Sequence, residues 1–206
     1  MLKDREGILK KYLVRPFSTR ITKVIVDTKI TPNQITLLYI LLSLLSSYFF
    51  LQGSYRELII GAVILKIAYI FDGVNGELAR IRKITSEFGS WFDDFGDRIR
   101  ESVTFISLAI GLYKVSNDVN VLYLGLLAVA NVLLVAFAKS PTLSKNVSTK
   151  PEFNIGKNFF GFTDTTVYVT IISALLNQVY ILLWVYSTVG ALVWMKKLIS
   201  IYREHN

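Results

Sequence analysis

Acidic side chains recur at helical spacing in the segment FDGVNGELARIRKITSEFGSWFDDFGD, which begins at Phe71 and follows the apolar run AVILKIAYI. Asp72 and Asn75 are three residues apart, and Asp93 and Asp97 are four apart, so each pair shares one side of a helix. Carboxylates this close together repel one another, and a divalent cation relieves the repulsion. Oxygen ligation without His or Cys suits Mg²⁺, Mn²⁺ or Ca²⁺. The pattern therefore predicts a metal site.

Two helices must carry these side chains, with a break between Lys83 and Ser86. If the helices run antiparallel, the acidic side chains face one another across a narrow gap. Gly76 and Gly89 leave room there for a bulky ligand beside the backbone, and Arg80 adds positive charge for a phosphate. Carboxylates, a hard cation and an arginine are typical of phosphoryl transfer. The alternative is that the carboxylates only form a solvated helix end.

The composition argues against other kinds of active site. The chain has 206 residues, no Cys and a single His, His205, which argues against disulfides, Cys-ligated zinc and Ser-His-Asp catalysis. It is 52% hydrophobic and carries a net charge of +8. Long uncharged runs such as Ile35–Leu51 and Thr165–Met195 favour a membrane protein, and no nucleic-acid partner is expected.

We expect an all-α, polytopic membrane protein with six transmembrane helices. A bilayer core of ~30 Å needs about 20 apolar residues per helix. Thr31 and Pro32 suit the start of the first helix, and Asn177 lies in a polar turn between the last two. Lys66 falls inside the second helix, where it would face the protein interior or a water-filled cavity, or snorkel to the surface. The apolar runs place the helices near residues 34–52, 57–80, 90–114, 119–139, 160–176 and 179–198.

Residues 1–30 form a first unit, a cytoplasmic juxtamembrane segment, and residues 31–206 form the membrane domain. Basic and apolar side chains mix at roughly helical spacing in residues 1–30, which predicts an amphipathic interfacial helix; a disordered basic tail is the alternative. In the six-helix arrangement 20 of the Lys and Arg residues fall on one side, and only Arg56 and Lys114 fall on the other. This asymmetry predicts that both termini and the acidic segment are cytoplasmic.

The acidic segment resembles the signature of the CDP-alcohol phosphotransferase (CDP-alcohol phosphatidyltransferase) family. That signature reads D-x-x-D-G-x-x-A-R, eight residues, then G-x-x-x-D-x-x-x-D, and seven of its eight fixed positions match here. The family's six-helix membrane architecture also fits the whole chain. The stretches KKYLVRPFSTRITK and GELAR resemble the di-myo-inositol-phosphate-phosphate synthase branch. The fixed positions correspond to Asp72, Asn75, Gly76, Ala79, Arg80, Gly89, Asp93 and Asp97.

The resemblance implies a role for each of these residues. Two ions, Mg²⁺ or Mn²⁺ (Ca²⁺ in a crystal), would bind the diphosphate of a CDP-alcohol. Asp97 would be the general base for the hydroxyl of an acceptor alcohol, and CMP would be released. The donor could be a lipid such as CDP-diacylglycerol or a soluble molecule such as CDP-inositol. The implied metal ligands are Asp72, Asn75, Asp93 and Asp97, and the implied nucleotide-binding residues are Asn33, Gly76, Ala79, Arg80, Ser86 and Gly89.

Basic residues near the acidic segment suit a phosphorylated acceptor such as inositol phosphate. Arg98 follows Asp97, and Lys139 and Lys157 lie on the predicted cytoplasmic side. The alternative is that the lysines only fix the topology. Membrane lipids and a second copy of the chain, in a homodimer of the kind the family often forms, are the other expected partners.

The departure from the signature is Asn75, which stands where the family has its second Asp. An amide oxygen can still bind a cation, but the site loses one negative charge, so its metal affinity should fall. This departure leaves open an attenuated or non-catalytic protein that binds nucleotide. A transporter is a third possibility, suggested by Lys66 and Asp72 within the membrane.

Overall fold

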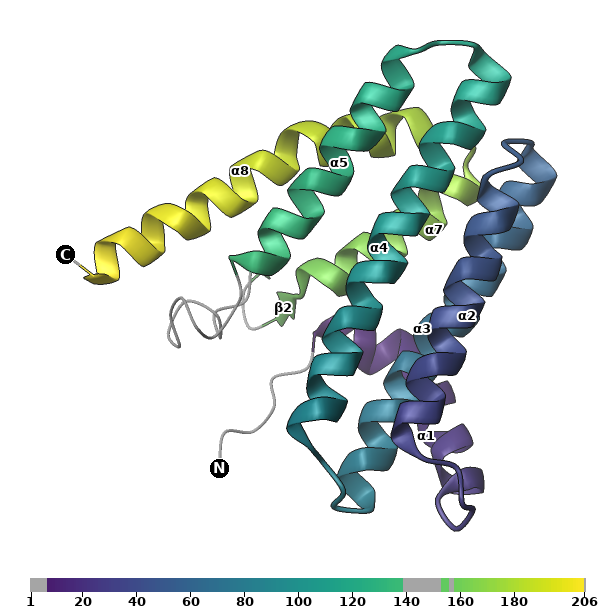
Figure 1. Cartoon of the computed structure of the whole chain (residues 1–206), viewed down its shortest axis with the longest axis vertical. Helices are drawn as coiled ribbons and strands as arrows, with labels where there is room; N and C mark the ends of the chain where they lie inside the picture. Colours follow the sequence, from purple (N-terminus) through teal and green to yellow (C-terminus); the bar gives the residue numbers. More distant parts are fainter. Residues whose placement is uncertain (1–6, 139–152, 156–157, 206) are drawn as a thin grey trace.

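Helices build nearly the whole molecule. The structure is a computed structural model that describes residues 7–138, 153–155 and 158–205 (Figure 1). Two short strands, β1 (Phe153–Ile155) and β2 (Asn158–Phe160), pair antiparallel and add a hairpin that the sequence did not predict. The helices are η1 (Lys10–Val14, a π-helix), α1 (Arg15–Ile25), α2 (Pro32–Phe50), α3 (Tyr55–Ile81), α4 (Glu87–Ser116), α5 (Asn120–Phe137), α7 (Phe162–Leu175) and α8 (Val179–His205).

The helices α2, α3, α4, α5, α7 and α8 occupy the six predicted segments. The largest difference is at the end of α8, which continues to His205 instead of stopping near residue 198. Among the described residues, three helices, α2, α5 and α8, contain a segment that is long and apolar enough to cross a membrane. Helices α3 and α4 are also long, with 27 and 30 residues, but they carry the charged side chains of the signature.

One end of the helical bundle gathers the segments that carry the signature. In Figure 1 the connections α1–α2 and α3–α4 lie together at the lower end, and the connections α2–α3 and α4–α5 lie at the upper end. Helix α2 packs against both α3 and α4, and α5 packs against α8. The start of α2, the end of α3 and the start of α4 therefore meet.

A capping box starts α2. The Thr31 hydroxyl accepts a hydrogen bond from the backbone N–H of Gln34 (3.3 Å), and the Gln34 side-chain oxygen accepts one from the N–H of Thr31 (2.9 Å). Pro32 occupies the first helical position, where its missing N–H is not needed. The predicted start is confirmed, and it places Asn33 in the first turn.

A Schellman motif ends α3 directly after the signature arginine. The N–H of Ile84 donates to the carbonyl of Ala79 (3.0 Å), and the N–H of Lys83 donates to that of Arg80 (3.2 Å), with Lys83 in the left-handed region (φ 55°). Two residues later Ser86 caps α4, since its hydroxyl accepts from the N–H of Gly89. The predicted break is confirmed, and it turns α4 back beside α3.

The N-terminal helix α1 is fastened to α3 by polar contacts. Arg15 pairs with the buried Glu77 (2.6 Å), which also accepts a hydrogen bond from the Ser18 hydroxyl. The Lys66 ammonium donates to the carbonyl of Leu13 (2.8 Å) and to the Tyr168 hydroxyl. Of the two alternatives for Lys66, the structure has the one in which its side chain faces the protein.

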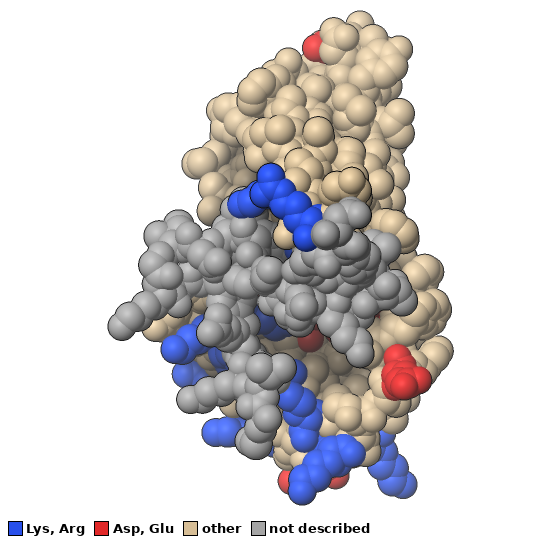
Figure 2. Space-filling view, turned by 90° about the vertical axis from the view of Figure 1, so that its left-hand side faces the viewer, with Lys and Arg blue, Asp and Glu red and all other residues tan. Residues whose placement is uncertain are grey.

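Charged side chains are unevenly distributed along the bundle. On the face seen in Figure 2, blue Lys and Arg atoms are found from the middle of the molecule down to its lower end, and the upper end is tan apart from one acidic residue. The lower half is the end that holds the α3–α4 connection. Arg56 lies in the first turn of α3 and Lys114 in the last turn of α4, beside the upper connections, and the Lys114 ammonium donates to the carbonyl of Leu51 (2.8 Å).

Candidate functional site

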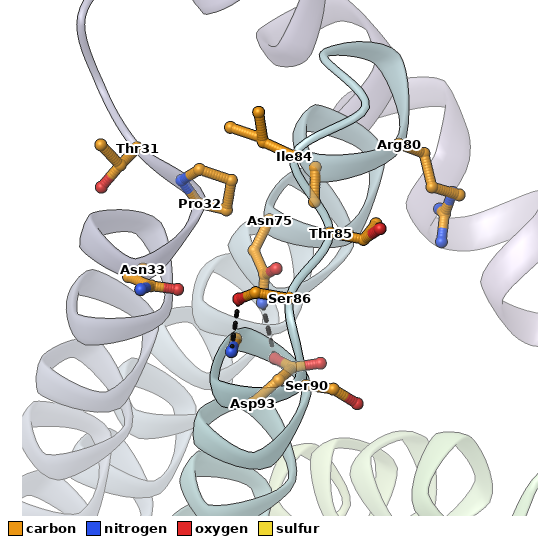
Figure 3. A pocket seen from close by; sticks show the side chains of 13 residues that line it. Thr31, Pro32, Asn33, Asn75, Arg80, Ile84, Thr85, Ser86, Ser90 and Asp93 are labelled. Carbon is orange, nitrogen blue, oxygen red and sulfur yellow. Dashed lines mark hydrogen bonds between the residues drawn. The ribbon is translucent and has the colours of Figure 1, made fainter.

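A cleft of about 300 Å³ opens where α2 begins, α3 ends and α4 begins (Figure 3). We call it the signature cleft. All six residues predicted to bind nucleotide line it, and they share it with the predicted metal ligands Asn75 and Asp93. Thr31, Thr85 and Ser90 add hydroxyl groups that the sequence reasoning missed. The full lining is Thr31, Pro32, Asn33, Asn75, Gly76, Ala79, Arg80, Ile84, Thr85, Ser86, Gly89, Ser90 and Asp93.

Asn75 and Asp93 meet in this cleft, from facing sides of α3 and α4. The Asn75 amide nitrogen donates to Oδ1 of Asp93 at 2.6 Å (Figure 3). The Tyr39 hydroxyl, from α2, donates to the backbone carbonyl of Asp93 (2.8 Å) and lies 3.2 Å from the same Oδ1. An ionised aspartate at position 75 would place a second anion beside Asp93, whereas the amide donates a hydrogen bond to it.

Asp72 and Asp97 lie on either side of Arg100. Its Nη2 is 2.7 Å from Oδ1 of Asp97, and its Nη1 is 3.8 Å from Oδ2 of Asp72. The guanidinium is 1% exposed and lies over the rings of Tyr39 and Tyr69, 5.7 and 5.3 Å from their centroids. Both carboxylates thus share one buried counter-charge, which links the two predicted metal ligands that do not line the signature cleft.

Arg100 and Lys10 are charged residues of this region that the sequence reasoning missed. Arg100 follows Asp97 by three residues, so helical spacing could have found it. Lys10 comes from η1, far away in the sequence, and its Nζ lies 3.8 Å from Oδ2 of Asp72. The Asp72 carboxylate raises the pKa of Lys10 above its ordinary value, against the opposing effect of burial, so this ammonium stays protonated.

Two further polar groups lie beside this region. The Tyr69 hydroxyl, on α3, hydrogen-bonds the carboxylate of Asp164, which is in the first turn of α7. Gly7 packs so closely on Asp164 that a Cβ at this glycine would collide with the carboxylate oxygen. The chain before α1 therefore covers α7 as well as α3.

The predicted acceptor residues are only partly described. Arg98 pairs with the buried Glu101 (2.6 Å) and lies 3.8 Å from Oδ2 of Asp97. Lys139 and Lys157 lie outside the described residues. Arg98 is thus the predicted acceptor cation whose place is known, and it is next to the proposed general base.

The donor set suits a hard divalent cation, since the signature supplies three carboxylates and an amide oxygen, and Asp72 and Asn75 are only 6% and 7% exposed. Buried carboxylates need a counter-charge. In the described part of the chain no group of three acidic or His side chains has converged closely enough to hold a metal ion. Arg100, Lys10 and the Asn75 amide contact these carboxylates instead. Metal ligation therefore stays a prediction.

Gly76→Ala should weaken nucleotide binding without harming the fold. A Cβ at Gly76 would meet nothing closer than the flexible guanidinium of Arg80, at 3.5 Å, and alanine favours helix over glycine by about 1 kcal/mol. The new methyl group would project into the signature cleft, so we expect the melting temperature to hold and CMP to bind about tenfold more weakly. Calorimetric titration with CMP measures this. If the variant and the parent bind CMP with equal affinity, Gly76 does not line the predicted nucleotide site.

Comparison with known proteins agrees with this arrangement. Residues 29–201 match the sequence profile of the CDP-alcohol phosphatidyltransferase family. The chain is 36% identical over 107 residues to "Bifunctional IPC transferase and DIPP synthase" of Aquifex aeolicus. The aligned region covers 52% of this chain and 24% of that protein. It is 36% identical over 93 residues to the archaetidylinositol phosphate synthase of Pyrococcus horikoshii, covering 45% of this chain and 47% of that one. The chain thus spans less than half of these relatives.

Solved structures share the fold. The Mycobacterium tuberculosis phosphatidylinositol phosphate synthase with CDP-DAG bound has a TM-score of 0.75 at 17% identity, covering 91% of this chain and 94% of that chain. The same enzyme with manganese and citrate has a TM-score of 0.74 at 17% identity, covering 90% and 88%. The profile match covers most of the chain, six of the eight signature residues line one cleft, and the helices follow the same fold. The chain belongs to the CDP-alcohol phosphatidyltransferase family.

Proposed function

We propose that this protein is an integral membrane enzyme that transfers a substituted phosphate group from a CDP-alcohol to an acceptor alcohol and releases CMP. The observation that carries the proposal is the signature cleft, in which all six predicted nucleotide-binding residues meet Asn75 and Asp93. Family membership supports the same reaction. The reaction would serve the synthesis of phospholipids or of inositol phosphate diesters.

In this proposal the cleft holds the cytidine and the diphosphate of the donor. Arg80 neutralises phosphate charge, and Asn33 and Ser86 offer hydrogen-bonding groups from the opposite walls. Asp72, Asn75, Asp93 and Asp97 hold divalent cations, Mg²⁺ or Mn²⁺, which when bound offset the charge on the attacking and leaving oxygens. The Mycobacterium tuberculosis enzyme of the same fold was crystallised with manganese and citrate, which supports this choice of ion.

Asp97 is the proposed general base. It would accept the proton of the acceptor hydroxyl as that oxygen attacks the phosphorus bearing the donor alcohol. Arg100, 2.7 Å from Oδ1 of Asp97, holds the carboxylate in place. The P–O bond to CMP breaks as the new P–O bond forms, so the alcohol and its phosphate leave the nucleotide together.

The acceptor is proposed to be a phosphorylated alcohol such as inositol phosphate. One relative is an archaetidylinositol phosphate synthase, and a neighbour of the same fold is a phosphatidylinositol phosphate synthase crystallised with CDP-DAG. A phosphorylated acceptor needs cations, and Arg98, Lys139 and Lys157 are the proposed ones. The donor is proposed to be a CDP-alcohol of the lipid or inositol type, and the protein is proposed to act as a homodimer.

We propose six membrane spans with both termini and the site on the cytoplasmic side. The charge asymmetry along the bundle supports the orientation (Figure 2). At ~1.5 Å per residue the 14-residue α7 is about 21 Å long, so this span is shorter than a ~30 Å core. In α1 the buried side chains are Ser18 and Thr22, whereas Phe17 and Val24 are exposed by 50% and 78%. These exposed apolar side chains support contact between α1 and the membrane surface.

A screen of CDP-alcohol donors against acceptor alcohols, with CMP read by mass spectrometry, tests the proposal. CMP should form with Mn²⁺ or Mg²⁺ present and cease in EDTA. If well-folded protein releases no CMP from any pair of CDP-diacylglycerol or CDP-inositol with inositol phosphate or glycerol phosphate, the transferase proposal fails. Solute flux in proteoliposomes without CMP would instead support a transporter.

Asn75→Asp should make the protein depend more strongly on divalent cations. Without metal, the new carboxylate would stand beside Asp93, where the amide donates a 2.6 Å hydrogen bond, so the melting temperature should fall. With MnCl₂ the added charge should bind the ion about tenfold more tightly and recover that stability. Thermal unfolding across a MnCl₂ titration measures both effects.

Asn75→Ala is the matched control, because it removes the amide without adding charge. Its melting temperature should fall without metal and should not recover more than the parent does in MnCl₂. If Asn75→Asp responds to MnCl₂ no more than the parent protein, position 75 does not contact the ion.

A further inference from the structure

One arginine that belongs to no signature position makes four hydrogen bonds to backbone carbonyls. Arg82 directly follows the last residue of α3, and its guanidinium reaches across to the connection between α1 and α2. Nε donates to the carbonyl of Val26 (2.8 Å) and Nη1 to that of Ile30 (2.6 Å). Nη2 donates to the carbonyls of Ile25 (2.8 Å) and Thr28 (2.6 Å).

These bonds satisfy backbone groups that the end of α1 leaves open. The last carbonyls of a helix have no partner within the helix and carry partial negative charge, which a cation stabilises. Arg82 supplies three nitrogens at fixed angles, so one side chain binds four carbonyls within the short segment 25–30. A lysine offers its donors from a single atom and could not span the carbonyls of Ile25 and Ile30 together.

The segment that Arg82 holds leads directly into one wall of the signature cleft. Ile30 precedes Thr31, whose capping box starts α2, and Thr31, Pro32 and Asn33 line the cleft. The opposite wall comes from the end of α3, two residues before Arg82. The guanidinium therefore ties the two walls together from outside the cleft, without lining it.

We infer that Arg82 is a positioning residue that sets the separation between the two walls of the signature cleft, and thereby the affinity for the cytidine nucleotide. The inference rests on the proposed function of the cleft. Arg82 touches neither wall's side chains and acts through the backbone of residues 25–30. Without it, the first turn of α2 keeps its capping box, and its position against α3 depends on apolar contacts such as the cluster of Ile35, Val74 and Leu78.

The position of the segment can be measured without any ligand. The chain contains no Cys, so the double variant Lys29→Cys/Glu87→Cys, at two exposed sites, gives a unique pair for spin labels. Double electron–electron resonance should give one narrow distance distribution with Arg82 present. Arg82→Gln should broaden it, and Arg82→Lys should fall between the two. Lys83→Gln is the control, because the neighbouring lysine is exposed; it should leave the distribution unchanged.

Calorimetric titration with CMP in MnCl₂ measures the consequence. Arg82→Gln should bind CMP about tenfold more weakly than the parent, and Lys83→Gln should bind it equally well. A role in folding alone would lower the melting temperature and leave the affinity of the folded protein unchanged. If Arg82→Gln does not fold, the same comparison is made with Arg82→Lys.

The outcomes separate this inference from the proposed function. An unchanged distance distribution in the Arg82 variants, or a changed distribution with unaltered CMP affinity, overturns the inference. A parent protein that binds no CMP at all overturns the proposed function, while the label distances still report whether Arg82 holds the segment. A broadened distribution together with weaker CMP binding supports both.

Discussion

Asp97→Asn should abolish CMP release while leaving the protein folded and able to bind CMP. Asparagine has nearly the shape of aspartate, so its side-chain oxygen can still face Arg100, whose Nη2 lies 2.7 Å from Oδ1 of Asp97. It cannot take up a proton from an acceptor hydroxyl. Loss of a general base costs about 10²–10⁴ in rate, and loss of a cation ligand adds to this, so we expect a fall of at least about 10³-fold.

The measurement is the initial rate of CMP formation in Mn²⁺, beside the melting temperature and the CMP affinity. Asp94→Asn is the matched control, because Asp94 is adjacent in the sequence but lies off the stripe formed by Asp93 and Asp97. The control should keep the parent rate within about twofold. A rate for Asp97→Asn above a tenth of the parent value would remove Asp97 from the role of general base.

Arg100→Met should be the most destabilising of these substitutions. Methionine fills part of the volume but leaves Asp72 and Asp97 without their shared counter-charge in a region where Arg100 is 1% exposed. Removing one partner of a buried ion pair costs about 3–5 kcal/mol. Thermal and denaturant unfolding in detergent measure the loss, which MnCl₂ should partly reverse because a divalent cation can replace the missing charge.

Arg56→Met serves as the comparison, since Arg56 is exposed at the opposite end of the bundle. Surface changes of this kind stay within about 0.5 kcal/mol. If Arg100→Met is no less stable than Arg56→Met, the buried guanidinium is not what neutralises the two aspartates. A stability loss that MnCl₂ leaves unaltered would separate Arg100 from the cation-binding residues.

Much of the fold could be predicted because it depends on local patterns. Uncharged runs located α2, α5, α7 and α8, and weaker apolar runs, one of them interrupted by Lys66, located α3 and α4. The Thr31 capping box and the break after Ile81 follow from short-range chemistry. The signature residues of the cleft could be predicted because fixed spacing on α3 and α4 places them on facing sides, whereas Thr31, Thr85 and Ser90 were missed and Asp72 and Asp97 lie outside the cleft. The end of α8 was wrong by seven residues, since the polar stretch after residue 198 continues the helix to His205.

The charges that balance the site could not be predicted in the same way. Arg100 has the right helical spacing to Asp97, but in a sequence a buried arginine looks the same as an exposed one. Lys10 reaches Asp72 from a separate segment, and no periodicity relates the two. The four carbonyls that bind Arg82 are backbone groups of an irregular turn. Every residue has such a carbonyl, so the residue types do not show which ones bind an arginine. Such contacts depend on how distant segments meet.

The lysine and arginine that neutralise Asp72 have a consequence for how the protein tolerates starvation for manganese or magnesium. Many metal-dependent proteins unravel when their ion is withdrawn, because bare carboxylates are left to repel one another. Here Lys10 and Arg100 lie beside Asp72 as built-in substitutes. We expect the protein to stay folded when the proposed divalent cation is withdrawn. It should then regain its proposed activity as soon as the ion returns, without new protein synthesis.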